Sequence, residues 1–160
     1  MKTIEILVGI QCSGKSTYCK DKWNLANNSD NIEYPVTLSR DNIRETNQFS
    51  QPYVYSKYNE DIVTDIYNAQ LRFALRQTLR DVILLDNTHC EEKYIDDIIS
   101  KYGKDNKIIV KFFDISLSKA QYRNIIRYFK TGKWIPIRTI NQFYKNYNKI
   151  NKKKYEQYKC

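Results

Sequence analysis

Residues 3–17 read TIEILVGIQCSGKST, and this segment carries the pattern from which the fold class follows. Residues 3–8 form a short apolar run rich in β-branched side chains, which predicts a buried strand ending in a turn. Residues 9–16, GIQCSGKS, match the P-loop pattern G-x-x-x-x-G-K-[ST], and helix-forming residues follow from Lys15 to about Leu25. A strand, a glycine loop and a helix in this order predict a phosphate-binding loop.

The side chains of this loop have the chemistry that a nucleotide requires. Its two glycines permit the tight turn by which successive backbone N–H groups point inward toward phosphate oxygens. Lys15 supplies a positive charge for the β- and γ-phosphates, and the Ser16 hydroxyl is a ligand for Mg²⁺. Cys12 is interpreted as a small spacer and not as a nucleophile. We therefore expect ATP and Mg²⁺ to bind here. The residues expected to contact the nucleotide are Gly9, Gln11, Cys12, Ser13, Gly14, Lys15, Ser16 and Thr17.

The rest of the chain alternates strands and helices. Hydrophobic patterning predicts further strands at 34–38, 82–85 and 107–113, and helices at 42–46, 57–80, 91–102, 118–129 and 137–150. This alternation predicts an α/β fold, a three-layer P-loop NTPase sandwich with a parallel sheet and a helical lid. In such sheets ligands bind at the carboxyl ends of the strands, so the polar residues that follow each strand are the candidates for function.

Two carboxylates are expected at that edge. Asp86 ends the apolar run 82–85 and is a Walker B-like candidate that holds Mg²⁺ through water or positions an arginine; alternatively, it caps the next turn. Asp41 follows the strand at 34–38, and Arg44 lies three residues further on, so both project onto one face of a short helix. There Asp41 can accept a proton from an attacking hydroxyl while Arg44 grips a substrate phosphate. The alternative is a capped helix with a local ion pair.

A third group of candidates lies near the carboxyl end of the chain. Arg123 and Arg127 are four residues apart on the helix predicted at 118–129, just before residues 130–133, KTGK. Two guanidinium groups on one helix face predict a lid that closes over the nucleotide and stabilises charge on the transferring phosphoryl group. The alternative is a solvated basic face. Trp134, beside this lid, is a candidate for stacking on adenine or on another base.

The composition favours some classes of protein and excludes others. The chain has 160 residues, with 27 Lys and Arg against 18 Asp and Glu, and a formal charge of +9. The length suits one domain, and the charge favours a polyanionic partner, nucleic acid first, although AT-rich coding would raise the same residues. No run approaches the roughly 18–20 apolar residues of a membrane span, and no signal-peptide cleavage site follows the first strand. We expect no membrane partner and a cytoplasmic location, in the host cytoplasm if the chain is viral.

The four cysteines and the single histidine point to no metal or disulfide framework. Their spacing contains no Cys-x-x-Cys pair, so we expect reduced thiols and no tightly held zinc ion. His89 lies two residues beyond Asn87 near the predicted active edge, where it could touch a substrate, but a loop histidine without a catalytic role is the preferred interpretation. It is left out of the catalytic set, and the oligomeric state stays open.

Several segments carry a family resemblance in consistent order: the P-loop, residues 38–44 (LSRDNIR), residues 85–88 (LDNT), and residues 113–137 from Phe-Asp to Ile-Pro-Ile. Over nearly its whole length the chain resembles the phage-type 5′-hydroxyl polynucleotide kinase domain. The resemblance implies that Asp41 is the general base and that Arg44 contacts a phosphate of the acceptor. It also implies that Arg127, with Arg123 beside it, clamps the phosphates of the donor. The sequence lacks the Asp-x-Asp-Gly-Thr motif of the familiar phage enzyme's phosphatase domain.

The expected function is ATP-dependent transfer of the γ-phosphate to the 5′-hydroxyl end of DNA or RNA by a P-loop kinase domain at residues 1–150. The expected catalytic residues are Lys15, Asp41, Arg44 and Arg127, and Ser16 and Asp86 are the expected metal ligands. The alternatives are a kinase for hydroxymethylated bases in phage DNA, a small-molecule or nucleoside kinase, and a nucleic-acid-binding NTPase module without catalysis. Residues 151–160 form a Lys/Tyr-rich tail that either binds a strand by charge and stacking or is a frayed terminal helix.

Overall fold

A computed structural model describes residues 1–27, 34–46, 49, 53–77 and 81–159 of the chain. The last three residues of the helix expected at 57–80 and the thiol of Cys160 lie outside the described residues. Cys12, Cys19 and Cys90 are free thiols. Within the described ranges, no helix is both long enough and apolar enough to span a membrane.

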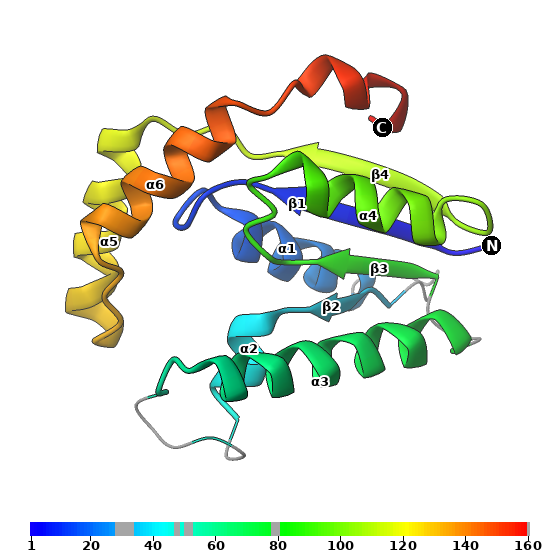
Figure 1. The fold of residues 1–160 in the computed structure, drawn as a ribbon, viewed down its shortest axis with the longest axis horizontal. Helices are drawn as coiled ribbons and strands as arrows, with labels where there is room; N and C mark the ends of the chain where they lie inside the picture. Colours follow the sequence, from blue (N-terminus) through cyan, green and yellow to red (C-terminus); the bar gives the residue numbers. More distant parts are fainter. Residues whose placement is uncertain (28–33, 47–48, 50–52, 78–80, 160) are drawn as a thin grey trace.

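The centre of the molecule is a parallel sheet of four strands. The strands are β1 (Thr3–Val8), β2 (Val36–Leu38), β3 (Val82–Leu85) and β4 (Lys107–Phe112), in the order β2-β3-β1-β4. β1 pairs with β3 on one side and with β4 on the other, so that Ile4 lies opposite both Ile83 and Ile108. Because every pair is parallel, all four strands end at one edge of the sheet, as the arrowheads in Figure 1 show.

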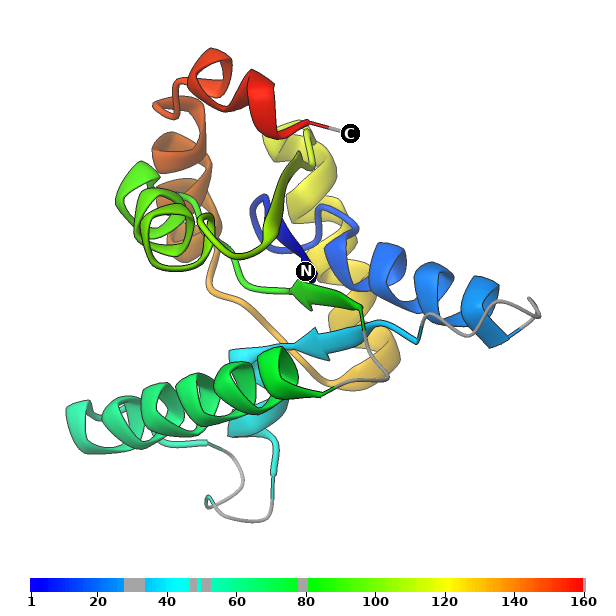
Figure 2. The same ribbon diagram turned by 90° about the vertical axis from the view of Figure 1, so that its right-hand side faces the viewer.

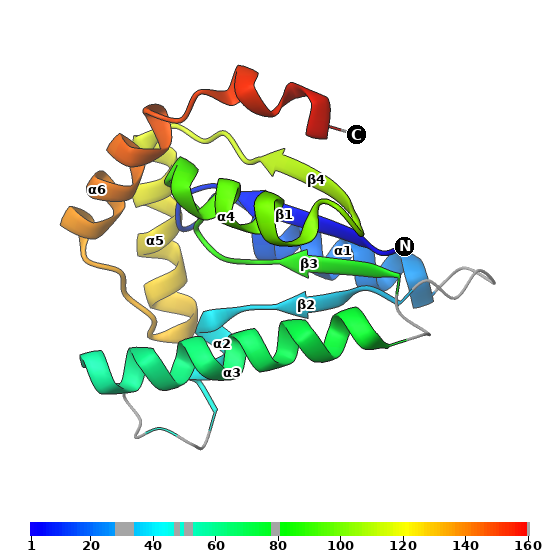
Figure 3. The same cartoon turned by 45° about the vertical axis from the view of Figure 1, so that its right-hand side comes forward.

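Helices cover both faces of this sheet. The helices are α1 (Lys15–Asn27), α2 (Arg40–Arg44), α3 (Lys57–Arg76), α4 (Glu92–Tyr102), α5 (Leu117–Thr131) and α6 (Ile137–Asn148), followed by the 3₁₀ helix η1 (Lys152–Tyr158). α1 lies on one face, while α3 and α4 lie on the other (Figure 2). α5 and α6 stand as a pair beyond the carboxyl ends of the strands (Figure 3). The predicted α/β fold with three layers is confirmed.

The core is divided unequally between the two faces. Along β1 the side chains alternate, so Ile4, Ile6 and Val8 enter a large cluster that includes residues of α3, α4 and α6. Leu7 points to the other face, where it meets Cys19 of α1 and a few further side chains. The face that carries α3 and α4 therefore holds most of the buried apolar side chains.

Element ends differ from the predictions by a few residues, for local reasons. The helix expected at 42–46 begins instead at Arg40, because Ser39 has the extended backbone of an N-cap residue. The helix expected at 57–80 ends at Arg76, where Gln77 turns to extended φ and ψ. α5 runs two residues past its predicted end, to Thr131, and stops where Gly132 takes a left-handed conformation, φ 71°.

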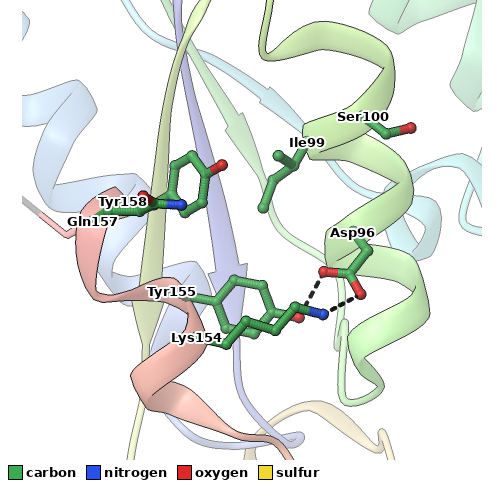
Figure 4. A pocket seen from close by; sticks show the side chains of 7 residues that line it. All are labelled: Asp96, Ile99, Ser100, Lys154, Tyr155, Gln157 and Tyr158. Carbon is green, nitrogen blue, oxygen red and sulfur yellow. Dashed lines mark hydrogen bonds and ion pairs between the residues drawn. The ribbon is translucent and has the colours of Figure 1, made fainter.

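The tail is packed onto the domain and is not frayed. Tyr155 of η1 is only 1% exposed, and its ring lies 6.1 Å from that of Phe112 in β4. Its hydroxyl donates to Asp96 of α4 at 2.9 Å, and Lys154 Nζ donates to the same carboxylate at 2.6 Å. Figure 4 shows these groups beside a cavity of about 260 Å³ between η1 and α4. The tail thus contributes to the core next to β4.

Replacing Tyr155 by alanine should lower the free energy of unfolding by about 3–5 kcal/mol, the usual cost of removing a buried aromatic ring. The variant Tyr155→Phe keeps the ring and loses only the hydrogen bond to Asp96, so we expect a loss of about 1 kcal/mol. Urea unfolding followed by circular dichroism measures both variants. Equal midpoints for the two would show that the ring is not part of the core.

Candidate active site

The P-loop connects the carboxyl end of β1 to the amino end of α1, and its backbone needs two unusual conformations. Cys12 has φ 62° and Gly14 has φ 107°, both in the left-handed region. A Cβ atom on Gly9 would lie 2.8 Å from Ser13 Oγ and 3.0 Å from Phe113 Cβ, so only glycine fits this close approach. Cys12, predicted to be a spacer, therefore occupies a position of backbone strain that a small side chain tolerates.

The interior of the loop fits a phosphate group. The buried Ser13 hydroxyl has no hydrogen-bond partner among the described residues, so it is available to a phosphate oxygen. Lys15 is 7% exposed, and its Nζ donates to the carbonyl oxygens of Gly9 at 2.8 Å and Ile10 at 2.9 Å. Burial lowers the pKa of Lys15, while the nearby carboxylates of Asp86 and Asp41 act in the opposite direction. The ammonium group thus lies inside the loop and within electrostatic reach of both predicted carboxylates.

The two residues predicted to hold Mg²⁺ are in direct contact. Ser16 Oγ donates to Asp86 Oδ2 at 2.7 Å, although the two are 70 residues apart in the chain. Where side chains are described, no group of three or more His, Cys, Asp or Glu residues could hold a metal ion. Mg²⁺ usually keeps several waters and binds through one or two protein ligands together with substrate phosphates. A hydroxyl and a carboxylate beside a phosphate loop fit that mode of binding.

The second carboxylate lies on α2, at the carboxyl end of β2. Arg44 Nη1 donates to Asp41 Oδ1 at 2.7 Å, so the predicted pair on one helix face is present. The Asp41 side chain is 72% exposed, whereas the Arg44 side chain is only 16% exposed. The carboxylate is therefore open to an incoming molecule, and the guanidinium is held by its surroundings.

The group that holds Arg44 is Glu60, which the sequence interpretation missed. Arg44 Nε donates to Glu60 Oε1 at 2.9 Å and its Nη2 donates to Oε2 at 2.7 Å, a bidentate pair. Tyr53 donates its hydroxyl to Glu60 Oε1 at 2.9 Å, and Arg40 donates to Oε2 at 3.4 Å. The rings of Tyr53 and Tyr55 lie 5.9 and 5.6 Å from the Arg44 guanidinium carbon. Glu60 thus orients the cation that faces Asp41.

Glu60 also makes folding stability depend on pH. The hydrogen bonds from Arg44 lower the pKa of Glu60 from 4.5 to about 2. A carboxyl whose pKa is lower in the folded chain contributes stability above its ordinary pKa, and that contribution is lost as the pH falls from about 4.5 to about 2. The stability difference between the natural chain and Glu60→Gln should therefore be large at pH 6 and small at pH 2.

The control for this prediction is Asp97→Asn, which removes an exposed ion pair with Lys101 on α4. Exposed pairs contribute little to stability, so this difference should be small at every pH. Urea unfolding of the three proteins between pH 2 and pH 6 measures the effect. A difference for Glu60→Gln that does not change with pH would contradict the assigned role of the carboxylate.

The predicted lid helix, α5, contacts the P-loop, and the turn after it contacts the segment that follows α2. Arg123 Nη1 donates to the carbonyl oxygen of Cys12 at 3.1 Å, a contact that joins α5 to the loop. Arg127 lies one turn further on, and no hydrogen bond or ion pair links its guanidinium to the described part of the chain. Lys133 forms an ion pair with Glu45, the residue that follows α2. The structure therefore brings both lid arginines and the Asp41 side of the site to the same edge of the sheet.

The buried Asn124 fixes the turn that follows α5. Its amide nitrogen donates to the carbonyl oxygen of Ile135 at 2.8 Å, and its Oδ1 accepts from the Ile135 N–H at 3.2 Å. Trp134 is thereby placed at the end of the lid, where its ring lies 5.9 Å from that of Tyr128. The side chain stays partly exposed, as a stacking residue requires.

His89 is buried against the sheet. It has φ 40°, and its Nδ1 lies 3.3 Å from the carbonyl oxygen of Leu7 in β1. Burial lowers the pKa of His89 to about 4, so the imidazole is neutral at pH 7.

A parallel sheet whose first strand runs through a glycine loop into a helix, with a lysine buried inside that loop, defines a P-loop nucleotide-binding domain. The sequence agrees with this class, because the family model described as "AAA domain" matches residues 4–150. The chain belongs to this family. No curated protein matches it.

The chain is also similar to chains in solved structures. A chain of the Pnkp1/Rnl/Hen1 RNA repair complex is 26% identical, with a TM-score of 0.77, over 99% of this chain and 47% of that chain. A chain of a second Pnkp1/Rnl/Hen1 complex is 24% identical, with a TM-score of 0.60, over 76% and 39%. A gluconokinase from Sinorhizobium meliloti 1021 is 14% identical, with a TM-score of 0.49, over 91% and 74%.

The family match and the match to the first chain of the RNA repair complex confirm the predicted fold class, and the domain is a P-loop domain of the kinase type. Among the structural neighbours are components of an RNA repair complex. The chain spans about half the length of the first matched chain of that complex.

Proposed function

We propose that this chain is an ATP-dependent kinase that transfers the γ-phosphate to the 5′-hydroxyl end of DNA or RNA. The proposal rests on one observation: the P-loop, which is the expected donor site, and the pair Asp41 and Arg44, which is the expected acceptor site, lie at the same edge of the sheet. Asp41, on α2 after the carboxyl end of β2, is exposed beside Arg44, and it lies at the same edge of the parallel sheet as the P-loop that follows β1. A site with a phosphate loop on one side and a carboxylate paired with an arginine on the other can bind a donor and an acceptor together.

In the proposed reaction, each residue acts on a stated group. Asp41 accepts the proton of the 5′-hydroxyl, whose oxygen forms a bond to the γ-phosphorus as the bond to the bridging oxygen of ADP breaks. Arg44, oriented by Glu60, binds a phosphate of the acceptor and places the hydroxyl. Lys15 and Arg127 stabilise the charge on the transferring group. Mg²⁺, held by Ser16 and Asp86, would supply further charge neutralisation when bound.

Two observations favour a polynucleotide acceptor over a small one. The match to a chain of an RNA repair complex extends over 99% of this chain at 26% identity. The formal charge of +9 suits a partner with a phosphate backbone. Arg44 provides a cation for one acceptor phosphate at the site itself.

The test is to offer γ-labelled ATP to a panel of acceptors and to map the label. The panel contains DNA and RNA oligonucleotides with 5′-hydroxyl ends, a hydroxymethyluracil duplex, a nucleoside and gluconate. We expect label at the 5′ ends of the oligonucleotides, with activity that falls steeply as salt is added. Label on the modified base, or only on a small molecule, would show that the acceptor is not the proposed 5′-hydroxyl end. ATP binding without transfer to any acceptor would favour a non-catalytic module.

A further inference from the structure

The positive charge of the chain is concentrated in one segment. Residues 115–155 contain 11 Lys and Arg and no Asp or Glu, whereas the other 119 residues contain 16 Lys and Arg against 18 Asp and Glu. The whole excess of positive charge therefore belongs to α5, α6 and most of η1. These elements follow one another along one side of the molecule, beyond and above the sheet in Figure 1.

Part of this charge has no compensating carboxylate. Lys133, Lys152 and Lys154 form ion pairs with acidic residues outside the segment. By contrast, four side chains of α5 and the start of α6 make no hydrogen bond or ion pair with any residue that the structure describes: Lys119, Arg127, Lys130 and Arg138. The lid therefore carries positive charge that no described carboxylate pairs with.

Exposed aromatic side chains lie in the same place. Tyr122 and Phe129 on α5 are 63% and 82% exposed, and they lie on the side of the helix opposite the buried Ala120 and Asn124. The rings of Phe129 and Trp134 each contact Tyr128, at centroid distances of 5.8 and 5.9 Å. We call these four rings, Tyr122, Tyr128, Phe129 and Trp134, together with Lys119 and Lys130, the lid aromatic surface.

The elements that carry this surface lie next to the site. α5, which carries three of the rings, contacts the P-loop through Arg123 and Cys12. The turn after α5, which carries Trp134, contacts the residue that follows α2 through the ion pair between Lys133 and Glu45. The carboxyl end of α5 therefore lies near α2, which carries Arg44.

We propose that the lid aromatic surface binds single-stranded nucleic acid, namely the nucleotides that follow the phosphorylated end of the acceptor. The role as acceptor contact rests on the proposed function. Bases stack on aromatic rings without regard to sequence, and lysines beside the rings bind the phosphates, which is how proteins hold single strands. A duplex does not expose the faces of its bases, so this surface selects unpaired strands.

The test measures binding without catalysis. A fluorescein-labelled single-stranded 12-mer that already carries a 5′-phosphate is titrated with the full chain in the absence of ATP, and anisotropy gives the Kd. Phe129→Ala should raise the Kd about tenfold, the effect of one lost base–aromatic stack. Phe129→Trp should restore binding. The control is Phe73→Ala on α3, which removes another exposed phenylalanine (66%) outside the basic segment and should leave the Kd unchanged.

Salt dependence tests the ionic part of the proposal. The variant Lys130→Gln should reduce the slope of log Kd against log salt by about 0.7, the change expected for one lost phosphate contact on a single strand. A duplex of the same sequence should bind more weakly than the single strand and should respond less to Phe129→Ala. An unchanged slope, or a duplex that binds as tightly as the single strand, would contradict the proposal.

If the surface binds something else, the experiment gives a different result, and each such result would contradict the proposed binding of single strands. If Phe129→Ala leaves the oligonucleotide Kd unchanged but dissociates a dimer in size-exclusion chromatography, the surface binds a second copy of the chain. If the variant weakens binding of ATP and not of the oligonucleotide, the rings bind adenine. The oligonucleotide already carries its phosphate, so loss of binding in Phe129→Ala is independent of transfer. A failure of the labelling test would refute the proposed function and leave this binding result intact.

Discussion

Replacing Asp41 by alanine is expected to abolish phosphoryl transfer while ATP binding stays unchanged. The carboxylate is the proposed acceptor of the hydroxyl proton, and general-base catalysis of this kind contributes about 10²- to 10⁴-fold to a rate. Its removal should therefore lower kcat by about that factor. Lys15, which is proposed to bind the nucleotide, donates its hydrogen bonds to the P-loop carbonyls of Gly9 and Ile10 and does not depend on Asp41 for them.

The structure adds a distinction between kcat and KM. Arg44 loses its ion pair with Asp41 in the variant but keeps both hydrogen bonds to Glu60. The guanidinium should therefore keep its orientation, and the KM for the acceptor should change little compared with kcat. Steady-state kinetics with a 5′-hydroxyl oligonucleotide and calorimetric titration with ATP measure the two effects.

The matched control is Asp65→Ala, which removes an exposed carboxylate from α3 and should leave both constants unchanged. Asp41→Asn keeps the size of the side chain and removes its basicity, so its kcat should be as low as that of Asp41→Ala. Transfer at the natural rate by Asp41→Asn would exclude Asp41 as the base.

Replacing Arg127 by alanine should lower kcat by about 10³-fold or more, the range found for arginines that stabilise phosphoryl transfer. Its guanidinium has no hydrogen bond or ion pair within the described ranges, so it is available to phosphate oxygens. Arg127→Lys should not restore the rate, because an ammonium group lacks the planar, bidentate geometry of a guanidinium.

Arg123 is the internal comparison for this prediction. Its guanidinium is already bonded to the carbonyl oxygen of Cys12, so Arg123→Ala should affect the position of the lid and lower kcat less than Arg127→Ala does. The control is Lys145→Ala, which removes an exposed lysine of α6 outside the lid aromatic surface and should leave kcat unchanged. If Arg123→Ala lowers kcat more than Arg127→Ala does, Arg123 and not Arg127 is the arginine that clamps the phosphates.

Most of the fold could be predicted because its signals are local. The run of β-branched residues in β1, the glycines of the P-loop and the helix formers of α1 lie within 27 consecutive residues, and each constrains its own backbone. The strands β3 and β4 are continuous apolar runs, as strands covered on both faces require. The carboxyl ends of parallel strands meet at one edge, so Ser16 and Asp86 could be expected together without any knowledge of the fold's details.

Glu60 illustrates what could not be predicted. In the sequence it is an acidic residue in the first turn of a helix, where acidic residues are common because they complement the helix dipole. Its partner Arg44 approaches it only because α3 packs against α2. Arg44 is a predicted site residue, but the group that orients it becomes visible only once these helices are placed together.

The environments of the tail and of His89 could not be predicted for the same reason. A run of lysines and tyrosines resembles a solvated end, yet the environment of Tyr155 is made by β4 and α4, and Asp96 receives its hydrogen bond from 59 residues away. His89 lies three residues after Asp86, a predicted metal ligand, but its ring is buried and contacts the backbone of β1 at Leu7.

The sequence by itself determined the class of the loop, the alternation of strands and helices, and the edge at which the polar residues gather, because each depends on neighbours within a few residues. Only the tertiary structure decided which charges are paired, which rings are buried and which stay exposed on the lid. These properties depend on contacts between segments that are distant in the chain, and local periodicity carries no information about such contacts.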